Sequence, residues 1–373
     1  MGSLDLIKVD DRRVAAFRLA RHLLSARSAG GPTQAAAAIG GLQAQVMSAA
    51  ELQAWSRVQN SQPGVVATAL WDQRSLVRTW SMRGTLHLMA SADLATYVGA
   101  HAAPARFDPV WLRAFGVTQE QMDSVLGLLP EVLDRRCLSR KELAQEVGLR
   151  AGTKLGGRLL SGWGEFLKPA ARRGLIVQGP PRGQEATFVR ADQWLGGWTP
   201  AQPEAARREW VRRYLSAYGP ATPADYARWM GVRQVGPGRA TFQALAEELI
   251  EVESGGGRAW LLARDRQELA GAPPPQVRLL AAFDPYLLGH VDRSHVIPRE
   301  HLAKVSRTAG WISAVVLVEG MAAATWTHAV ERGSLRLAVT PFGLLTAAAK
   351  AGIRRDAERL AGYFGTSLSL TYT

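Results

Sequence analysis

Apolar residues recur every three or four positions from residue 11 to about residue 28, and this spacing predicts an amphipathic first helix. A short helix is expected to follow and to be interrupted at Gly40–Gly41, after which a helical stretch carries Gln43 through about Arg57. Strand-forming residues then lie on both sides of Arg83–Gly84. That arrangement predicts a two-stranded hairpin with a tight turn.

The same order of elements recurs twice further along the chain. The segments SRKELAQEVG at 139–148 and TPADYARWMG at 222–231 each begin with a Ser or Thr, carry an acidic residue three positions later and close with Gly. Each therefore predicts a capping-box helix that ends at a C-cap glycine. After the first, a helical stretch to about residue 171 precedes a strand, a turn at Pro180–Pro181 and a second strand, and after the second the pattern is helix, strand, glycine turn and strand. Helices followed by a β-hairpin wing are typical of the winged-helix variant of the helix-turn-helix.

These patterns predict an α+β protein with three tandem winged-helix units and a C-terminal mixed α/β part. The units are expected at roughly 11–95, 130–192 and 205–264. The corresponding division of the whole chain is 1–128, 129–200, 201–269 and 270–373. The last part opens with the stiff linker AGAPPPQ, continues with strand-like stretches that begin at VRLLAAFDPYLLG, and closes with a helix from Leu344 to Phe364.

Charge changes this picture because it indicates a partner. The 45 Lys and Arg residues outnumber the 32 Asp and Glu residues, which gives a formal charge of +13. A polyanion, and nucleic acid first, is the expected partner. The alternative is that the excess of arginine reflects a high-GC genome and no such partner.

Cysteine content and hydropathy constrain the compartment. Cys137 is the single cysteine, so the chain has no internal disulfide and no multi-cysteine metal site. No leader-like stretch or apolar run of membrane-spanning length stands out in the sequence. We therefore expect a cytoplasmic protein that does not enter a membrane.

Conventional catalytic signatures are absent from the sequence. It contains no HExxH, no G-x-S-x-G, no dinucleotide fingerprint and no Walker A motif. The seven histidines show no compact metal-ligand spacing, with His290 and His295 five residues apart. We expect no metal and no cofactor.

Four segments together carry a resemblance. GLQAQ at 41–45, WSMRGTLHLM at 80–89, YGPATPADYARWMG at 218–231 and AAFDPYLLGHVDR at 281–293 occur in this order. The chain resembles the AlkZ-like winged-helix DNA glycosylases, which include the YcaQ-type enzymes. The resemblance implies three tandem winged helices in a concave DNA-binding shape. It also implies excision of N7-alkylguanine adducts and unhooking of interstrand crosslinks, in some members as protection of antibiotic producers.

Within that family the catalytic motif is Gln, an apolar residue, then Gln or Asp, and the resemblance places it at Gln43-Ala44-Gln45. An N7-alkylated purine is already cationic and leaves without a general acid, so two neutral amides that orient a water would suffice. Cationic lesions should then be preferred over neutral ones such as uracil. The alternative is that both glutamines only occupy different faces of a solvated helix.

The candidate DNA contacts are basic or polar side chains at the predicted wings and helix turns. They are Arg83, Thr85 and His87, which alternate along one strand, Lys168, Arg172 and Arg173 before the second wing, Arg228 and Arg233 around the third helix turn, and Arg293. The alternatives are a purely structural hairpin for the first group and solvated basic faces for the others.

Asp284 and the tryptophans are given structural roles. Asp-Pro at 284–285 more often starts a turn than supplies an acid, and Asp292 with Arg293 is interpreted as a structural or DNA-positioning pair. The tryptophans at 163, 229, 260 and 311 lie in helix and strand patterns where core packing is commoner.

These observations favour a monofunctional DNA glycosylase that binds double-stranded DNA carrying alkylated purines and acts as a monomer. No lysine accompanies the glutamines to support a lyase step. A non-catalytic winged-helix regulator or lesion sensor is the alternative, and a small-molecule enzyme is a third class.

Overall fold

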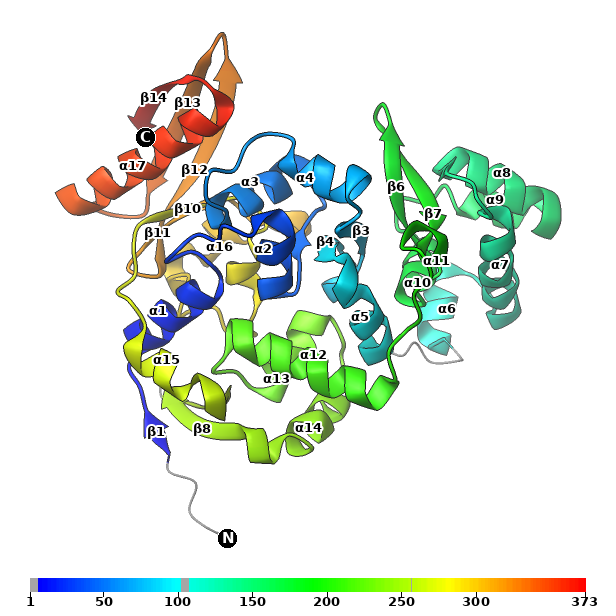
Figure 1. Ribbon diagram of the computed structural model, residues 1–373, viewed down its shortest axis with the longest axis horizontal. Helices are drawn as coiled ribbons and strands as arrows, with labels where there is room; N and C mark the ends of the chain where they lie inside the picture. Colours follow the sequence, from blue (N-terminus) through cyan, green and yellow to red (C-terminus); the bar gives the residue numbers. More distant parts are fainter. Residues whose placement is uncertain (1–5, 102–106, 256) are drawn as a thin grey trace. The chain divides into compact units, whose positions relative to one another are not determined.

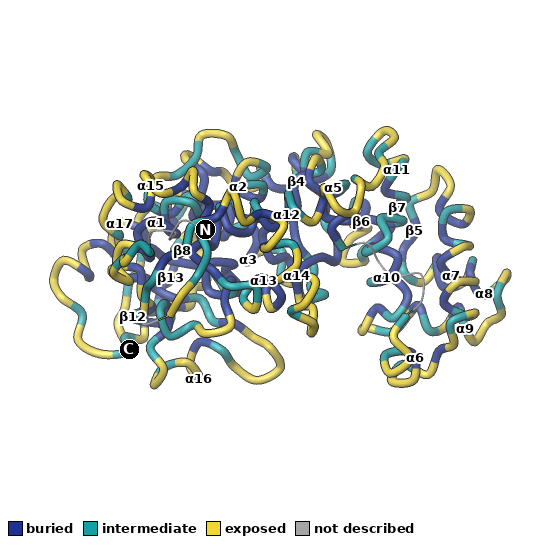
Figure 2. Tube along the Cα trace, turned by 90° about the horizontal axis from the view of Figure 1, so that it is seen from below, coloured by how far each residue is buried: buried dark blue, intermediate teal, exposed yellow. Residues whose placement is uncertain are grey.

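The computed structural model describes residues 6–101, 107–255 and 257–373, which form two compact units (Figure 1). The split unit combines the chain up to Ala67 with Val211–Thr373, and the inserted unit contains Thr68–Trp210. Both units mix helices with strands, so the predicted α+β class is confirmed. Buried stretches alternate with exposed ones within each unit (Figure 2).

The inserted unit contains two antiparallel hairpins separated by helices. Its elements are β3 (Leu76–Trp80), β4 (Leu86–Ala90), α5 (Leu94–His101), α6 (Pro109–Phe115), α7 (Gln119–Val132), β5 (Leu138–Ser139), α8 (Arg140–Ala151), α9 (Thr153–Arg158), α10 (Leu167–Arg172), β6 (Ile176–Arg182), β7 (Glu185–Arg190), α11 (Ala191–Trp194) and the first part of α12 (Pro203–Tyr218). The predicted hairpin around Arg83–Gly84 is present as β3 and β4, with Thr79 opposite His87.

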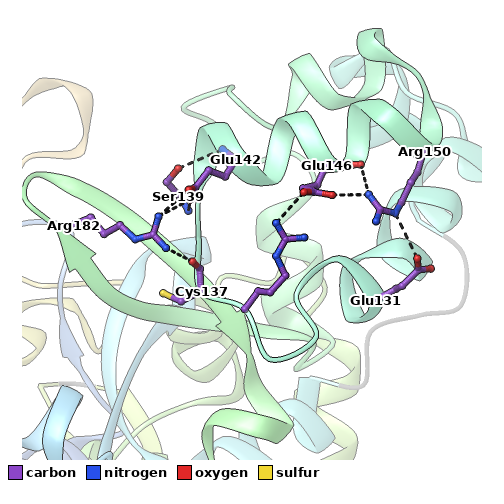
Figure 3. Close-up of polar contacts among 8 residues, drawn as sticks. Glu131, Cys137, Ser139, Glu142, Glu146, Arg150 and Arg182 are labelled. Carbon is purple, nitrogen blue, oxygen red and sulfur yellow. Dashed lines mark hydrogen bonds and ion pairs between the residues drawn. The ribbon is translucent and has the colours of Figure 1, made fainter.

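The predicted capping box starts α8. Ser139 Oγ accepts from the Glu142 N–H at 3.3 Å, and the Glu142 carboxylate accepts from the Ser139 N–H at 2.7 Å. Arg182, at the end of β6, donates to the same carboxylate at 2.8 Å and so ties this hairpin to the helix start (Figure 3). Reciprocal capping of this kind satisfies amide groups that the first helical turn leaves without partners.

The split unit has a three-stranded sheet in the order β1-β8-β9 and a five-stranded sheet in the order β10 to β14. Its elements are β1 (Ile7–Lys8), α1 (Asp11–Arg21), α2 (Gly31–Ile39), β2 (Leu42–Gln43), α3 (Met47–Arg57), α4 (Val65–Ala67), the rest of α12, α13 (Pro223–Met230), α14 (Gly236–Gln243), β8 (Leu249–Ser254), β9 (Gly257–Leu262), α15 (Arg266–Gly271), β10 (Arg278–Leu280), α16 (Leu302–Val305), β11 (Val315–Val318), β12 (Met321–Glu331), β13 (Ser334–Pro341), α17 (Ala347–Phe364) and β14 (Ser367–Tyr372). The predicted capping box at Thr222 is present at the start of α13.

Helix α3 packs on the five-stranded sheet. Leu52 and Trp55 from α3 join buried side chains of the sheet and of α17 in one apolar core. Trp326 of β12 is 3% exposed, and its indole N–H donates to the carbonyl of Leu280 at 2.9 Å. Helix α3 directly follows the segment Gln43-Ala44-Gln45, called the glutamine segment here. The packing of α3 on the sheet therefore fixes the position of the end of that segment.

The first helix is shorter than predicted and ends at Arg21. Leu23 adopts a left-handed conformation with φ 58°, and the Leu24 N–H bonds the Leu19 carbonyl at 2.8 Å. A left-handed residue after a helix is usually glycine. Because leucine stands there instead, the sequence does not indicate that the helix ends at this point. The Leu24 side chain that follows is buried, 1% exposed.

Two other strand predictions need correction, and one strand was not predicted. The turn expected at Pro180–Pro181 lies at Gly183 instead, because β6 runs through both prolines with an irregular register, as an edge strand permits. The strand expected from VRLLAAFDPYLLG is limited to β10 (Arg278–Leu280). Strand β14 was not predicted and pairs parallel with β13.

Candidate functional site

The glutamine segment leaves α2 through two glycines with positive φ, Gly40 at 74° and Gly41 at 131°. Leu42–Gln43 forms the short strand β2, and α3 begins at Met47. The prediction that a helix carries Gln43 and Gln45 is therefore wrong, and so is the alternative that places them on different faces of a helix. An extended backbone brings side chains two residues apart onto the same side.

The two amides touch each other but differ in burial. Gln43 is 5% exposed, whereas Gln45 is exposed to solvent. Gln43 Nε2 donates to Gln45 Oε1 at 3.2 Å. The buried amide thus holds the exposed one, whose oxygen keeps a second lone pair for another donor.

Gln53 supports this segment from the middle of α3. It is fully buried, and its Nε2 donates to the carbonyl of Gln43 at 3.1 Å and to that of Ala282 at 3.0 Å. Nothing in the sequence around Gln53 indicates this role. One side chain therefore links the glutamine segment to the chain that follows β10.

A buried ion pair fixes α3 against that same chain. Arg57 donates to both carboxylate oxygens of Asp284, at 2.8 and 2.7 Å, and both side chains are 0% exposed. Arg57 also donates to the carbonyl of Gln53 at 3.0 Å, and Asp284 accepts from the Tyr286 N–H at 3.0 Å. The structural role predicted for Asp284 is confirmed, and its carboxylate is occupied by these contacts.

In the inserted unit, His87 holds the turn of the first hairpin. Arg83 lies in the predicted turn with φ 57°, so it does not alternate with Thr85 and His87 along one strand, yet its Nη2 reaches His87 Nε2 at 3.2 Å. His87 Nδ1 lies 3.1 Å from the Thr85 carbonyl. These contacts fit a neutral imidazole that donates from Nδ1 and accepts at Nε2. Burial, and then the charge of Arg83, lowers the pKa of His87 to about 3.

Two of the three basic residues near the second wing belong with this turn. Arg172 Nη2 lies 3.4 Å from the position that a Cβ on Gly84 would take. Burial, and then the charge of Arg172, lowers the pKa of Lys168, which lies one helical turn away. Arg173 points elsewhere, to Asp123 at 3.9 Å and to the ring of Phe107 at 4.9 Å. Arg83, Lys168 and Arg172 form a group that we call the basic cluster.

In the split unit, Arg228 and Arg293 come together while Arg233 is exposed beyond α13. Burial, and then the charge of Arg228, lowers the pKa of Arg293. Arg293 donates to Ser306 Oγ at 3.1 Å, whereas Asp292 contacts Ser294 at 2.8 Å and Arg299 at 3.7 Å. The predicted pairing of Asp292 with Arg293 is therefore wrong.

Two of the tryptophans expected in the core are at the surface. Trp163 is 72% exposed and Trp311 is 44% exposed, whereas Trp229 is buried as predicted. Each exposed tryptophan lies in a loop, where the surrounding sequence pattern does not define an inner face.

No group of three or more His, Cys, Asp or Glu side chains in the described part of the chain is arranged to hold a metal ion. Among the same residues, no helix has both the length and the apolar content needed to cross a bilayer.

Comparisons with known proteins identify the class. The model of the DNA glycosylase AlkZ-like family matches residues 36–363. The chain is 35% identical over 369 residues to the interstrand DNA cross-link repair glycosylase of Streptomyces sahachiroi, covering 97% of this chain and 98% of that protein. The solved structure of the Streptomyces sahachiroi DNA glycosylase AlkZ matches with a TM-score of 0.90 and 32% identity, over 98% of this chain and 100% of that one.

The chain therefore belongs to the AlkZ-like DNA glycosylase family. It is a DNA glycosylase, a hydrolase that acts on damaged DNA.

Replacing Gln53 should destabilise the split unit. Gln53→Leu leaves the carbonyls of Gln43 and Ala282 without their buried donor, so we expect the free energy of unfolding to fall by about 1–3 kcal/mol, measured by urea denaturation. Gln59→Leu is the matched control, because Gln59 is exposed and donates to one carbonyl, that of Arg27. Equal shifts of the unfolding midpoint for the two variants would contradict the supporting role of Gln53.

His87 should make stability depend on pH. Its pKa is about 3 in the folded protein against an ordinary value of 6.5, so the unfolded chain binds more protons between these values. Stability is therefore lost as the pH falls from about 6.5 toward 3. In His87→Gln the free energy of unfolding, measured by urea denaturation, should decline less steeply between pH 6.5 and 4, by up to about 1.4 kcal/mol per pH unit. Parallel curves for the two proteins would rule out a neutral, buried His87.

Proposed function

We propose that this glycosylase hydrolyses the N-glycosidic bond of purines alkylated at N7, and that Gln43 and Gln45 position the water that attacks C1′. The observation that carries the proposal is the contact between the two amides on an extended segment, 3.2 Å from Nε2 to Oε1. Gln45 is exposed and available to a water, while Gln43 orients its oxygen.

The chemistry of the lesion suits a site built from neutral groups. Alkylation at N7 makes the base cationic, so it leaves as a neutral molecule and needs no proton from a general acid. The remaining tasks are to place the water and to stabilise an oxocarbenium-like transition state with fixed dipoles. Amide oxygens supply such dipoles without carrying charge.

Bulky adducts and interstrand crosslinks are included in the proposed substrates. The support is the relative from Streptomyces sahachiroi, whose name specifies cross-link repair and whose identity of 35% extends over 97% of this chain. A crosslink joined through N7 presents the same cationic leaving group as a simple adduct, so the same water-positioning step would release one of its ends.

The proposed DNA interface consists of winged-helix units that contact phosphates. Each predicted wing is a hairpin in the structure, namely β3–β4, β6–β7 and β8–β9. In the inserted unit the basic cluster and Thr85 are the proposed contacts, with His87 acting by orienting Arg83. In the split unit they are Arg228, Arg233 and Arg293, and the enzyme is proposed to act as a monomer without metal or cofactor.

A single-turnover assay tests the catalytic proposal. We expect alkali-labile product from a duplex with one N7-methylguanine and none from undamaged DNA. Gln43→Ala with Gln45→Ala should abolish release but change duplex affinity less than about twofold, since neutral amides contribute little to phosphate binding. Gln59→Ala is the matched control and should retain activity. Excision of uracil at a comparable rate would overturn the mechanism.

A pair of neighbouring arginines tests the DNA interface. Arg172→Ala should weaken binding to undamaged duplex and reduce the slope of log affinity against log salt by about 0.9, the contribution of one phosphate contact. Arg173→Ala is the control, because Arg173 faces Asp123 and Phe107, and it should change the slope less. The same change for both variants would remove Arg172 from the proposed interface.

A further inference from the structure

A cavity of about 780 Å³ lies in the split unit next to the glutamine segment. Its first wall is formed by Val46, the residue after Gln45, and by Ala49 and Leu52 of α3. Its other walls come from β12 and from the chain around α16. A volume of this size is typical of sites that take small organic molecules, and the proposed reaction on simple methyl adducts makes no use of it.

The cavity owes its volume to small side chains, and one of the two tryptophans that line it is partly exposed. Five of its lining residues are alanines, at positions 49, 281, 282, 303 and 314. Trp311 also lines it and is 44% exposed, with its ring 4.8 Å from that of Phe283 in an edge-on contact. A partly exposed indole in a concave site offers apolar area that a planar group can cover.

The loop that carries Trp311 is held in one shape. The Arg307 N–H donates to the Trp311 carbonyl at 2.8 Å, and the Ser313 N–H donates to the Val305 carbonyl at 2.8 Å. Between them the chain turns through Ala309 at φ 57° and Gly310 at φ 76°. The backbone on both sides of the ring is held before a ligand arrives, so binding does not have to order the loop.

The charges around the cavity restrict what it can bind. Lys304 and Arg307 line it, and its described lining residues include no Asp or Glu. A separate cationic group would be repelled by these two charges and would find no carboxylate among those residues. An uncharged apolar group flanked by a phosphate satisfies both the apolar walls and the two cations.

We infer that this cavity receives a planar, apolar substituent carried on N7 of the damaged guanine, with Lys304 and Arg307 on a neighbouring phosphate. The inference rests on the proposed function, since it requires the lesion to lie at Gln43 and Gln45. It adds a specificity site: a methyl adduct leaves the cavity empty, and an adduct with an aromatic substituent covers the Trp311 ring.

The test compares two duplexes that differ only in the substituent on N7, one with N7-benzylguanine and one with N7-methylguanine. The quantity measured is the ratio of their single-turnover excision rates. We expect Trp311→Ala to lower the benzyl-to-methyl ratio roughly tenfold, the scale expected for loss of contact with one aromatic ring. Ala303→Leu should also lower the ratio, because the larger side chain fills part of the cavity. Ala303 is exposed on α16, so we expect this substitution to leave folding intact.

Trp163→Ala is the matched control, because Trp163 is also exposed but belongs to the inserted unit. It should leave the ratio unchanged. If Trp311→Ala and Ala303→Leu leave the benzyl-to-methyl ratio unchanged, even where both rates fall, the cavity does not recognise the substituent and the inference is overturned.

Measurements of duplex affinity show whether the cavity recognises the substituent even when the enzyme releases no base. If the unaltered enzyme releases neither base, the proposed function fails. The cavity is then tested by binding. The double variant Gln43→Ala, Gln45→Ala is used, and its affinities for the benzyl and methyl duplexes are compared. Roughly tenfold tighter binding of the benzyl duplex, lost when Trp311→Ala is added, would support the cavity, and equal affinities would overturn it.

Discussion

The buried ion pair between Arg57 and Asp284 is the interaction on which the candidate active site depends. A pair with both side chains fully buried adds little stability over apolar packing, but removal of one partner leaves a charge without compensation. Its main effect is geometric. It locks the C-terminal end of α3 to the turn after β10, and Gln53, one helical turn earlier, bonds the glutamine segment and that same chain. The charged pair of Arg57 and Asp284 thus supports, through α3, a glutamine segment that carries no charge.

Neutrality extends to the histidines buried in both units. Burial comes first among the causes that lower the pKa of His22, His87 and His290, and the charge of nearby arginines adds to it in each case. In a chain with a formal charge of +13, such groups stay unprotonated near neutral pH. None of these three imidazoles supplies a proton under those conditions. A lesion that is already cationic asks for none, and uncharged amides do not repel it as a protonated site would.

Local signals allowed part of the fold to be predicted from the sequence. The capping boxes at Ser139 and Thr222 and the hairpin around Arg83–Gly84 depend on residues a few positions apart, and the structure contains all three. The conformation of Gln43 and Gln45 was predicted wrongly, because glutamine favours helices and the expected helix was started directly after Gly40–Gly41 instead of at Met47. The segment is bonded by Gln53, ten residues from Gln43, and the ion pair that fixes α3 joins Arg57 to Asp284, 227 residues apart.

The exposure of two tryptophans could not be predicted from the sequence either. Trp163 and Trp311 lie in patterns that resemble core elements, and only the fold shows that their rings are exposed. The family resemblance located the glutamine pair, but it did not indicate Gln53, the ion pair or the cavity. Each of these comes from side chains that meet only after α3 has packed on the five-stranded sheet.

Helix α3 therefore serves two neighbouring sites with different parts of its surface. Ala49 and Leu52 line the cavity, whereas Gln53 and Arg57 hold the motif and the ion pair. Five of the lining residues are alanines, whose side chains take no part in that hydrogen-bonded network. Their size can change without breaking a bond that positions Gln43. Under the proposed function, the range of accepted lesions can thus vary through the cavity walls while the water-positioning amides and their support stay the same.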